Sequence, residues 1–227
     1  YRVGVLTVLP PKMLGMLTSD NALRVLRQLR EIKGIQTFLL GDNEYILSKV
    51  GFKKDWWAGV NQYIFTLVSS IFEIIRTGKT SQSGIGSIDK GELMRILQYG
   101  NGSIDVRVHY LTNSEIDSGI SDETLLEKLY APQMIEGYKY NNTLAYIVNI
   151  DTPKSGDYTS IVKQIFSVSE KLSGSAISRL GMFIDPMLTD SIRVTMVNAG
   201  LKLPKVIVNR INGLTKDERK FSTKKSK

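Results

Sequence analysis

Residues 55–77, DWWAGVNQYIFTLVSSIFEIIRT, decide the fold of this chain. Apolar residues recur there every three or four positions, which predicts a helix roughly 34 Å long at 1.5 Å per residue. Because apolar residues occupy its other sides as well, we expect the helix to be buried nearly all round, at the centre of a folded domain. A membrane span is the alternative, since residues 56–72 carry no charge. The amide and hydroxyl side chains within that run, and a length short of the ~20 apolar residues that a span needs, favour the buried helix.

The residues before this helix have the pattern of an α/β domain. Tyr1–Leu9 is rich in β-branched residues and stops at two prolines, which predicts a buried strand. Ile35–Leu40 predicts a second buried strand. Between the two strands, Ser19 or Asp20 is placed to cap a helix that reaches about Lys33. The alternation of strand, helix, strand, turn and helix is typical of α/β folds.

The residues after the long helix predict a second, smaller unit. The run Gly78–Gly86 is rich in glycine and serine, and we place a domain boundary there. Four strands and several helices follow, which together predict a small α+β domain with one helix-covered sheet. The expected strands are 103–111, 143–150, 177–184 and 191–197, and the expected helices are 90–99, 121–129, 158–173 and one that follows Pro204.

The net charge of +8 lies almost entirely at the C-terminal end of the chain. Residues 1–200 carry 21 basic and 20 acidic side chains, whereas residues 201–227 carry nine and two. The basic character that would suggest nucleic-acid binding therefore belongs to the tail, and the body is close to neutral. The chain has no cysteine, which excludes disulfides and thiolate metal sites and fits a reducing cytosol. The only histidine, His109, lies in an alternating pattern, and we interpret it as a strand side chain.

Three residues have the chemistry to recognise a flat heterocycle. Asn43 lies in the turn after a predicted strand, and Trp57 and Asn61 are one turn apart near the start of the long helix. Base recognition requires an aromatic face together with amides that both donate and accept hydrogen bonds. A tryptophan and an amide at this spacing are more often core residues, so the residues alone leave both interpretations open.

Two carboxylates, Asp89 and Glu92, are three residues apart at the start of a predicted helix and therefore lie on one face. They also fit a capping box, which is the ordinary role of acidic residues in a first turn. The chain has neither a GxxxxGK[ST] loop nor a GxGxxG loop that opens a helix. A complete nucleotide site therefore cannot be built from these residues alone.

Motifs in a particular order resemble the tubulin/FtsZ superfamily over residues 1–200. Val3–Pro10 is similar to the strand before the sugar-binding loop of that family, and residues 42–44 are similar to its guanine-binding turn. Residues 59–71 are similar to its central core helix, and residues 86–93 to its synergy loop. Phe183–Val197 resembles the ending of FtsZ, in which an acidic turn separates the last two strands.

This resemblance implies an α/β fold divided into four parts. These are the end of a Rossmann-like GTPase domain (1–54), the central core helix (55–78), the synergy loop with a small α+β activation domain and its four-stranded sheet (79–209), and a basic C-terminal tail (210–227). Because the Gly-rich phosphate loop of the family is absent, the resemblance also implies that the chain is the C-terminal portion of a longer GTPase. GTP or GDP and Mg²⁺ would be bound mainly by the missing half and across the subunit interface, without a metal ligand in this chain, and the chain alone would be inactive.

The resemblance assigns roles to the candidate residues. Asn43 falls on the position that contacts guanine, Trp57 on the aromatic that stacks on it, and Asn61 on the residue that pairs with its edge. Asp89 and Glu92 fall on the acidic positions of the synergy loop. In the family that loop reaches the γ-phosphate of GTP held by the neighbouring subunit, where a carboxylate can orient the attacking water or accept its proton, so hydrolysis requires assembly.

Two features of the resemblance are incomplete. Ser87 stands where an asparagine is common in the synergy loop, which leaves the positioning of water by that residue open. The ribose-contacting positions fall near Leu14 and Thr18, whose side chains do not match those roles, so no ribose contact is assigned.

The tail is most similar to that of TubZ-type tubulins of plasmids and phages, whose C-terminus engages a DNA-bound adaptor. The resemblance implies a bacterial cytoplasmic GTPase that forms head-to-tail filaments and segregates plasmid or phage DNA, without a membrane partner. Alternatives are an FtsZ-like cytoskeletal or division protein, a non-enzymatic module whose basic tail binds nucleic acid or a partner, and a tail that only aids solubility. The tail residues expected to contact the adaptor or DNA are Lys216, Arg219, Lys220, Lys224, Lys225 and Lys227.

Overall fold

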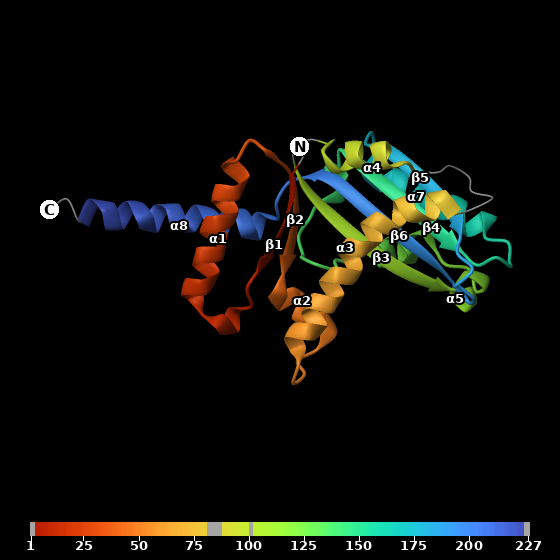
Figure 1. Cartoon of the computed structure of the whole chain (residues 1–227), viewed down its shortest axis with the longest axis horizontal. Coiled ribbons are helices and arrows are strands. Elements are labelled where there is room, and N and C mark those ends of the chain that lie inside the picture. Colours follow the sequence, from red (N-terminus) through yellow and green to blue (C-terminus); the bar gives the residue numbers. More distant parts are fainter. Residues whose placement is uncertain (1–2, 81–87, 100–101, 225–227) are drawn as a thin grey trace.

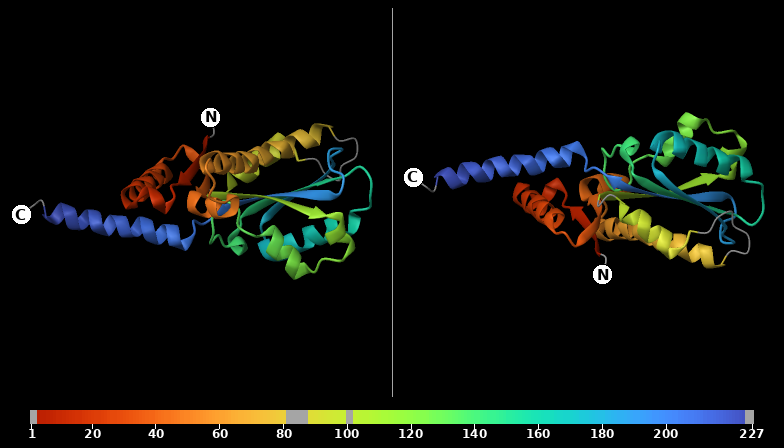
Figure 2. Two further views of the ribbon diagram at one scale, coloured as in Figure 1. Left: turned by 90° about the horizontal axis from the view of Figure 1, so that it is seen from below. Right: turned by 90° about the horizontal axis from the view of Figure 1, so that it is seen from above.

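A single mixed sheet of six strands forms the centre of the molecule, in the order β1-β2-β3-β6-β4-β5. The computed structural model describes residues 3–80, 88–99 and 102–224, without the side chains of residues 76–80 and 215–224. Helices cover both faces of the sheet (Figure 2), and the C-terminal helix α8 projects from one end (Figure 1). The mixed α/β class predicted from the sequence is confirmed.

The first part of the chain is a strand–helix–strand unit that leads into a short helix. Its elements are β1 (Val3–Leu9), η1 (Lys12–Leu14), α1 (Met16–Glu31), β2 (Ile35–Asp42) and α2 (Asn43–Val50). β1 and β2 are parallel, so their carboxyl ends meet at one edge. The predicted helix start at Ser19 or Asp20 is wrong, because α1 begins after Gly15, which adopts φ 87°. Glycine reaches that backbone conformation without a steric penalty, and Ser19 is then buried inside the helix.

Helix α3 (Trp56–Thr80) is the long helix that the sequence predicts. One face packs on the sheet through Val60, Ile64, Leu67, Ile71 and Ile74. The opposite face is open, since Phe65 and Phe72 are each 65% exposed. The prediction that α3 is buried nearly all round is therefore wrong for this chain, because the described elements cover only one side. By length and composition alone, residues 56–75 could cross a membrane, a test that core helices also pass.

The second part contains the four predicted strands. Its elements are α4 (Lys90–Leu97), β3 (Ser103–Thr112), α5 (Asn113–Asp117), α6 (Asp122–Leu129), η3 (Tyr140–Asn142), β4 (Ala145–Thr152), α7 (Thr159–Ser173), β5 (Ile177–Ile184), β6 (Ser191–Leu201) and α8 (Lys205–Lys224). β6 lies antiparallel between β3 and β4. β3 joins β2 through two residue pairs, which makes one sheet of both parts. Of the predicted linker 78–86, residues 81–86 lie outside the described residues.

Three apolar clusters hold these layers together. Along β4, Ala145 and Ile147 face α3 and α4, whereas Tyr146, Val148 and Ile150 face α6 and α7. β4 is thus buried on both faces, which explains its continuous apolar sequence. The third cluster joins α1 to the first half of α8. The sheet and its two helical layers therefore position the loops that carry the candidate residues.

Candidate functional site

Asn43, the first of the predicted guanine-contacting residues, lies where the parallel strands β1 and β2 end. Asp42 caps α2, because its Oδ1 accepts a hydrogen bond of 2.9 Å from the N–H of Glu44. The Oε2 of Glu44 accepts another of 2.9 Å from the N–H of Lys12, which ties the loop after β1 to the loop after β2. Burial is the main cause that raises the pKa of Asp42. Carboxyl ends of parallel strands are the usual position of ligand sites in α/β sheets.

Asn43 is the least solvated of the three predicted base contacts. It is 7% exposed in the first turn of α2, and its Oδ1 is buried without a hydrogen-bond donor among the residues that the structure describes. A buried carbonyl oxygen without a donor is costly, by about 1–3 kcal/mol. The Asn43 side chain thus keeps an unused hydrogen-bond acceptor next to the carboxyl ends of β1 and β2.

Trp57 and Asn61 lie on the first turns of α3, on the helix beside α2. Both are exposed, Trp57 by 42%, and its ring stacks on that of Trp56 with 3.9 Å between the centroids. α2 and α3 share a cluster through Ile46 and Val60, so the three predicted residues lie on two packed helices. In the described part of the chain no hydrogen bond joins Asn43 to Trp57 or Asn61. Their roles in base recognition stay predictions.

The capping box at Asp89 and Glu92 is present. The Oδ1 of Asp89 accepts from the N–H of Glu92 at 2.7 Å, and the Oε2 of Glu92 accepts from the N–H of Asp89 at 3.3 Å. The structure also shows a partner that the sequence analysis missed, because the Nε of Arg179 on β5 donates to the Oε1 of Glu92 at 2.8 Å. An arginine 87 residues away in a strand gives no local signal of this pairing. The catalytic roles of the two carboxylates stay predictions, and Ser87 lies outside the described residues.

A second missed group ties the long helix to the sheet. Arg193 on β6 donates to the Oε2 of Glu73 on α3 at 2.9 Å and to the Oδ2 of Asp151 on β4 at 2.8 Å. Burial raises the pKa of Asp151, which is 1% exposed, and the Arg193 guanidinium partly offsets this effect. The arrangement ties α3 to the neighbouring strands β4 and β6. His109 is a β3 side chain, as predicted, and burial lowers its pKa to about 4.

The predicted tail residues fall mainly within α8. The helix continues to Lys224, so Lys216, Arg219, Lys220 and Lys224 belong to it, although their side chains are not described. Lys225 and Lys227 lie outside the described residues. At the base of α8 lies a depression of about 1070 Å³. Among the residues that the structure describes, its lining includes no carboxylate and four cationic side chains, Arg30, Lys139, Lys202 and Lys205. Basic character thus extends from the tail onto the adjoining surface.

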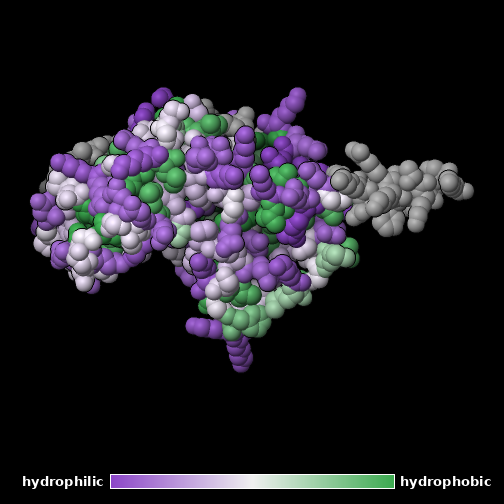
Figure 3. Space-filling view, turned by 180° about the vertical axis from the view of Figure 1, so that it is seen from behind, coloured by the Kyte–Doolittle hydropathy of each residue, from purple (hydrophilic) through white to green (hydrophobic). Residues whose placement is uncertain are grey.

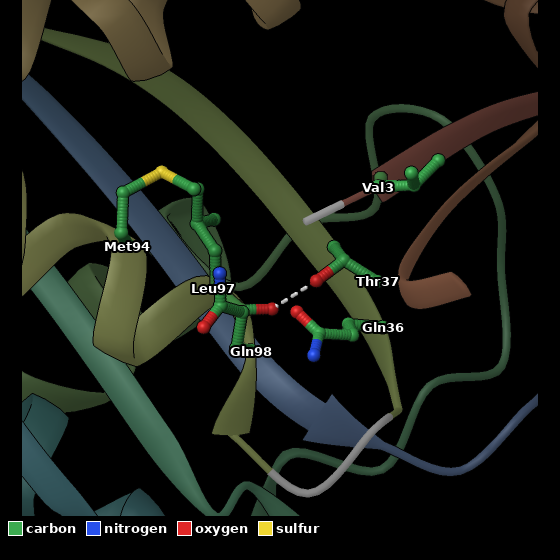
Figure 4. A pocket seen from close by; sticks show the side chains of 7 residues that line it. Val3, Gln36, Thr37, Met94, Leu97 and Gln98 are labelled. Atoms are coloured by element: carbon green, nitrogen blue, oxygen red, sulfur yellow. Dashed lines mark hydrogen bonds between the residues drawn. The ribbon is translucent and has the colours of Figure 1, made fainter. Parts of the chain in front are cut away.

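A cavity beside the first two strands is too small for a nucleotide. Its volume is about 80 Å³, and it lies between β1, β2 and α4 (Figure 4). The Thr37 hydroxyl donates to the Leu97 carbonyl oxygen beside it. Ligand pockets usually measure ~300–1,000 Å³, so we interpret this cavity as a gap in the packing of α4 against β1 and β2.

Solved structures with the same arrangement include CetZ, TubZ and FtsZ proteins. CetZ1 from Haloferax volcanii, a GDP-bound monomer, superposes with a TM-score of 0.72 at 15% identity, over 96% of this chain and 61% of that one. TubZ from Bacillus thuringiensis serovar israelensis, in GDP-form protofilaments, gives 0.71 at 14% identity, over 99% and 60%. An empty FtsZ dimer from M. jannaschii gives 0.65 at 17% identity, over 86% and 53%.

Comparisons of sequence alone add nothing to this result. No protein-family model matches the chain. No curated protein matches it either. The chain spans little more than half the length of the solved structures that it resembles. Over that span, the chain has the fold of the tubulin/FtsZ superfamily.

Proposed function

We propose that this chain is the C-terminal part of a tubulin-like GTPase that assembles into filaments and segregates plasmid or phage DNA in the bacterial cytoplasm, without a membrane partner. The observation that carries the nucleotide assignment is the buried Oδ1 of Asn43, which has no donor in the described part of the chain. Guanine presents N–H donors along one edge and a flat ring. Asn43 would accept from that edge, Asn61 would pair with it, and the exposed ring of Trp57 would stack on the base.

The phosphates and Mg²⁺ would be bound by a further part of the protein and across the subunit interface. Two open surfaces support such a part. β1 is the outer strand of the described sheet, with Val3 and Leu6 more than 40% exposed, and Phe65 and Phe72 are exposed on α3. On the face seen in Figure 3, apolar patches interrupt the hydrophilic surface. Apolar side chains on an open strand edge and on a core helix are typical of surfaces that another layer covers.

Hydrolysis would take place between subunits. Asp89 and Glu92 would reach the nucleotide of the next subunit, where a carboxylate orients a water or accepts its proton. Solved neighbours include GDP-form protofilaments and a two-stranded filament of TubZ, which supports assembly as the setting.

The test is Asp89→Asn in the full-length protein. Turnover of GTP per polymerised subunit should fall about a hundredfold, because general acid–base groups contribute roughly 10²–10⁴. The mass of polymer formed with a slowly hydrolysed GTP analogue should stay unchanged. Asp117→Asn, which removes an exposed carboxylate from α5, is the matched control. Normal turnover by Asp89→Asn filaments would contradict the catalytic assignment.

The segregation role rests on the basic end of the molecule. A neighbouring structure is described as a type III plasmid segregation TubZ, and α8 with the cationic depression at its base fits an acidic adaptor surface or DNA. Deletion of residues 215–227 should spare GTP turnover and weaken co-sedimentation of filaments with an adaptor–DNA complex, more so at low salt. Undiminished co-sedimentation would contradict the adaptor-binding role of the tail and leave it as a segment that only aids solubility.

A further inference from the structure

The two carboxylates of the capping box differ in how fully they are engaged. Both oxygens of Glu92 accept hydrogen bonds, Oε1 from Arg179 at 2.8 Å and Oε2 from the N–H of Asp89 at 3.3 Å. Asp89 uses Oδ1 for the N–H of Glu92, and its Oδ2 receives no hydrogen bond from any residue that the structure describes. Asp89 is exposed, whereas the Glu92 side chain is 28% exposed. Of the two carboxylates, Asp89 is therefore the more exposed and the one with an oxygen that has no donor in the described part of the chain.

Arg179 is held in place by the strand that carries it. Its Nη1 donates to the carbonyl oxygen of Ser178 at 2.8 Å while its Nε donates to Glu92. β5 pairs with β4 along its whole length, so the guanidinium projects from a fixed backbone. One N–H group of the planar guanidinium thus binds Glu92 while a second binds the backbone of β5, which restricts the position of the guanidinium.

The start of α4 docks on the same strand at a second point. Ile88, directly before the capping box, is 2% exposed, and its Cδ1 lies so close to Gly181 that a Cβ there would be 3.0 Å away. The apolar contact and the Arg179–Glu92 pair lie on either side of Asp89 in sequence. Together they fix the backbone that carries Asp89 relative to β5.

We propose that Arg179 is a positioning residue, which holds Glu92 in the closed capping box so that Asp89 alone presents a carboxylate oxygen to the nucleotide of the next subunit. This inference rests on the proposed function. Glu92 then acts through the N–H groups that it orders and not on the attacking water. The exposure of the Arg179 side chain, 44%, makes the pair accessible to substitution without opening the core.

The test compares Arg179→Gln and Arg179→Lys with Asp89→Asn in the full-length protein. Turnover per polymerised subunit should fall about tenfold or more in Arg179→Gln, because small misplacements of reacting groups have effects of that order. Arg179→Lys should recover part of this loss. The critical concentration for assembly with a slowly hydrolysed GTP analogue should not change, whereas a merely structural role would move it. Arg95→Gln, an exposed arginine on α4, is the control.

A double variant tests the coupling. Arg179→Gln with Glu92→Gln should be no slower than Glu92→Gln alone, because both act through one contact. If Asp89→Asn is slow and Arg179→Gln turns over normally, the role of Arg179 is overturned and the GTPase proposal stands. If Asp89→Asn itself turns over normally, the catalytic assignment in the proposed function and the role of Arg179 are both contradicted. Multiplicative losses in the double variant would also overturn the positioning role.

Discussion

Replacement of Arg107 by methionine should destabilise the chain in a pH-dependent way. Arg107 and Asp105 on β3 are buried, and the Nε of Arg107 lies 2.6 Å from the Oδ2 of Asp105. The Tyr140 hydroxyl donates to the same oxygen at 3.0 Å, and Arg107 also donates to the Leu129 carbonyl oxygen at 3.3 Å. This cluster holds the segment between α6 and η3 against the sheet. Burial raises the pKa of Asp105, and Arg107 partly offsets that effect.

The magnitude follows from the fate of the Asp105 carboxyl. Without Arg107 the carboxyl either stays ionised in the core or takes up a proton. In the unfolded chain the pKa of this carboxyl is 3.8, so protonating it costs about 4.4 kcal/mol at pH 7 and about 1.6 kcal/mol at pH 5. The loss in the free energy of unfolding cannot exceed these values, because the carboxyl takes up a proton when ionisation in the core would cost more. The pKa of Asp105 is higher in the folded chain than in the unfolded chain. Its contribution to the free energy of unfolding is therefore fully present below pH 3.8 and is lost as the pH rises through the pKa of the folded state. Removal of one partner of a buried ion pair typically costs about 3–5 kcal/mol, which agrees with the limit of about 4.4 kcal/mol at pH 7.

Urea unfolding followed by far-UV circular dichroism at pH 5 and pH 7 measures this effect. The matched control is Asp105→Asn with Arg107→Met, which changes the surroundings of His109 in the same way but lacks the carboxyl. At pH 7 the double variant should regain most of the stability that Arg107→Met loses, and at pH 5 the two should approach each other. An equal gap between them at both pH values would refute the argument from an uncompensated charge.

Three further predictions concern a histidine, a glycine and a tryptophan. Because burial lowers the pKa of His109 to about 4, the free energy of unfolding should fall by up to about 3 kcal/mol as the pH falls from 6.5 to 4. In urea unfolding His109→Gln should reduce this dependence on pH, and an unchanged pH profile would contradict a buried, neutral histidine. Gly181→Ala should lower the free energy of unfolding by about 1–3 kcal/mol, because the new Cβ would lie 2.9 Å from the Oδ1 of Asn149. The control is Gly213→Ala, whose Cβ would meet nothing within 4 Å and which should not lower the midpoint of thermal unfolding. In the full-length protein Trp57→Ala should weaken binding of a fluorescent GTP analogue about three- to tenfold with little change in unfolding, and unaltered affinity would remove Trp57 from the base site.

Local sequence patterns predicted the strands and most of the helices because they depend on short-range preferences. The six strands lie close to where the sequence predicts them, and the capping box at Asp89 appears as its spacing indicates. The start of α1 was missed because the left-handed Gly15 and the η1 turn before it outweigh the capping preference of Ser19. The open face of α3 could not be foreseen, since periodicity shows which residues are apolar and not which elements cover them.

The candidate site divides in the same way. Its residue types and their order could be read from the chain, because base recognition and helix capping each require particular side chains at short spacing. The donorless Oδ1 of Asn43 and the engagement of Glu92 by Arg179 could not, since they depend on how β2, α2, α4 and β5 meet.

By itself, then, the sequence determined the elements, their order and the presence of a basic end, because these follow from backbone preference and side-chain chemistry along the chain. Only the tertiary structure decided that β6 enters between β3 and β4, that β2 and β3 join two parts into one sheet, and that Asp89 and Glu92 are unequal. The physical reason is range: strand pairing, burial and ion pairs act between residues that are distant in sequence and near in space.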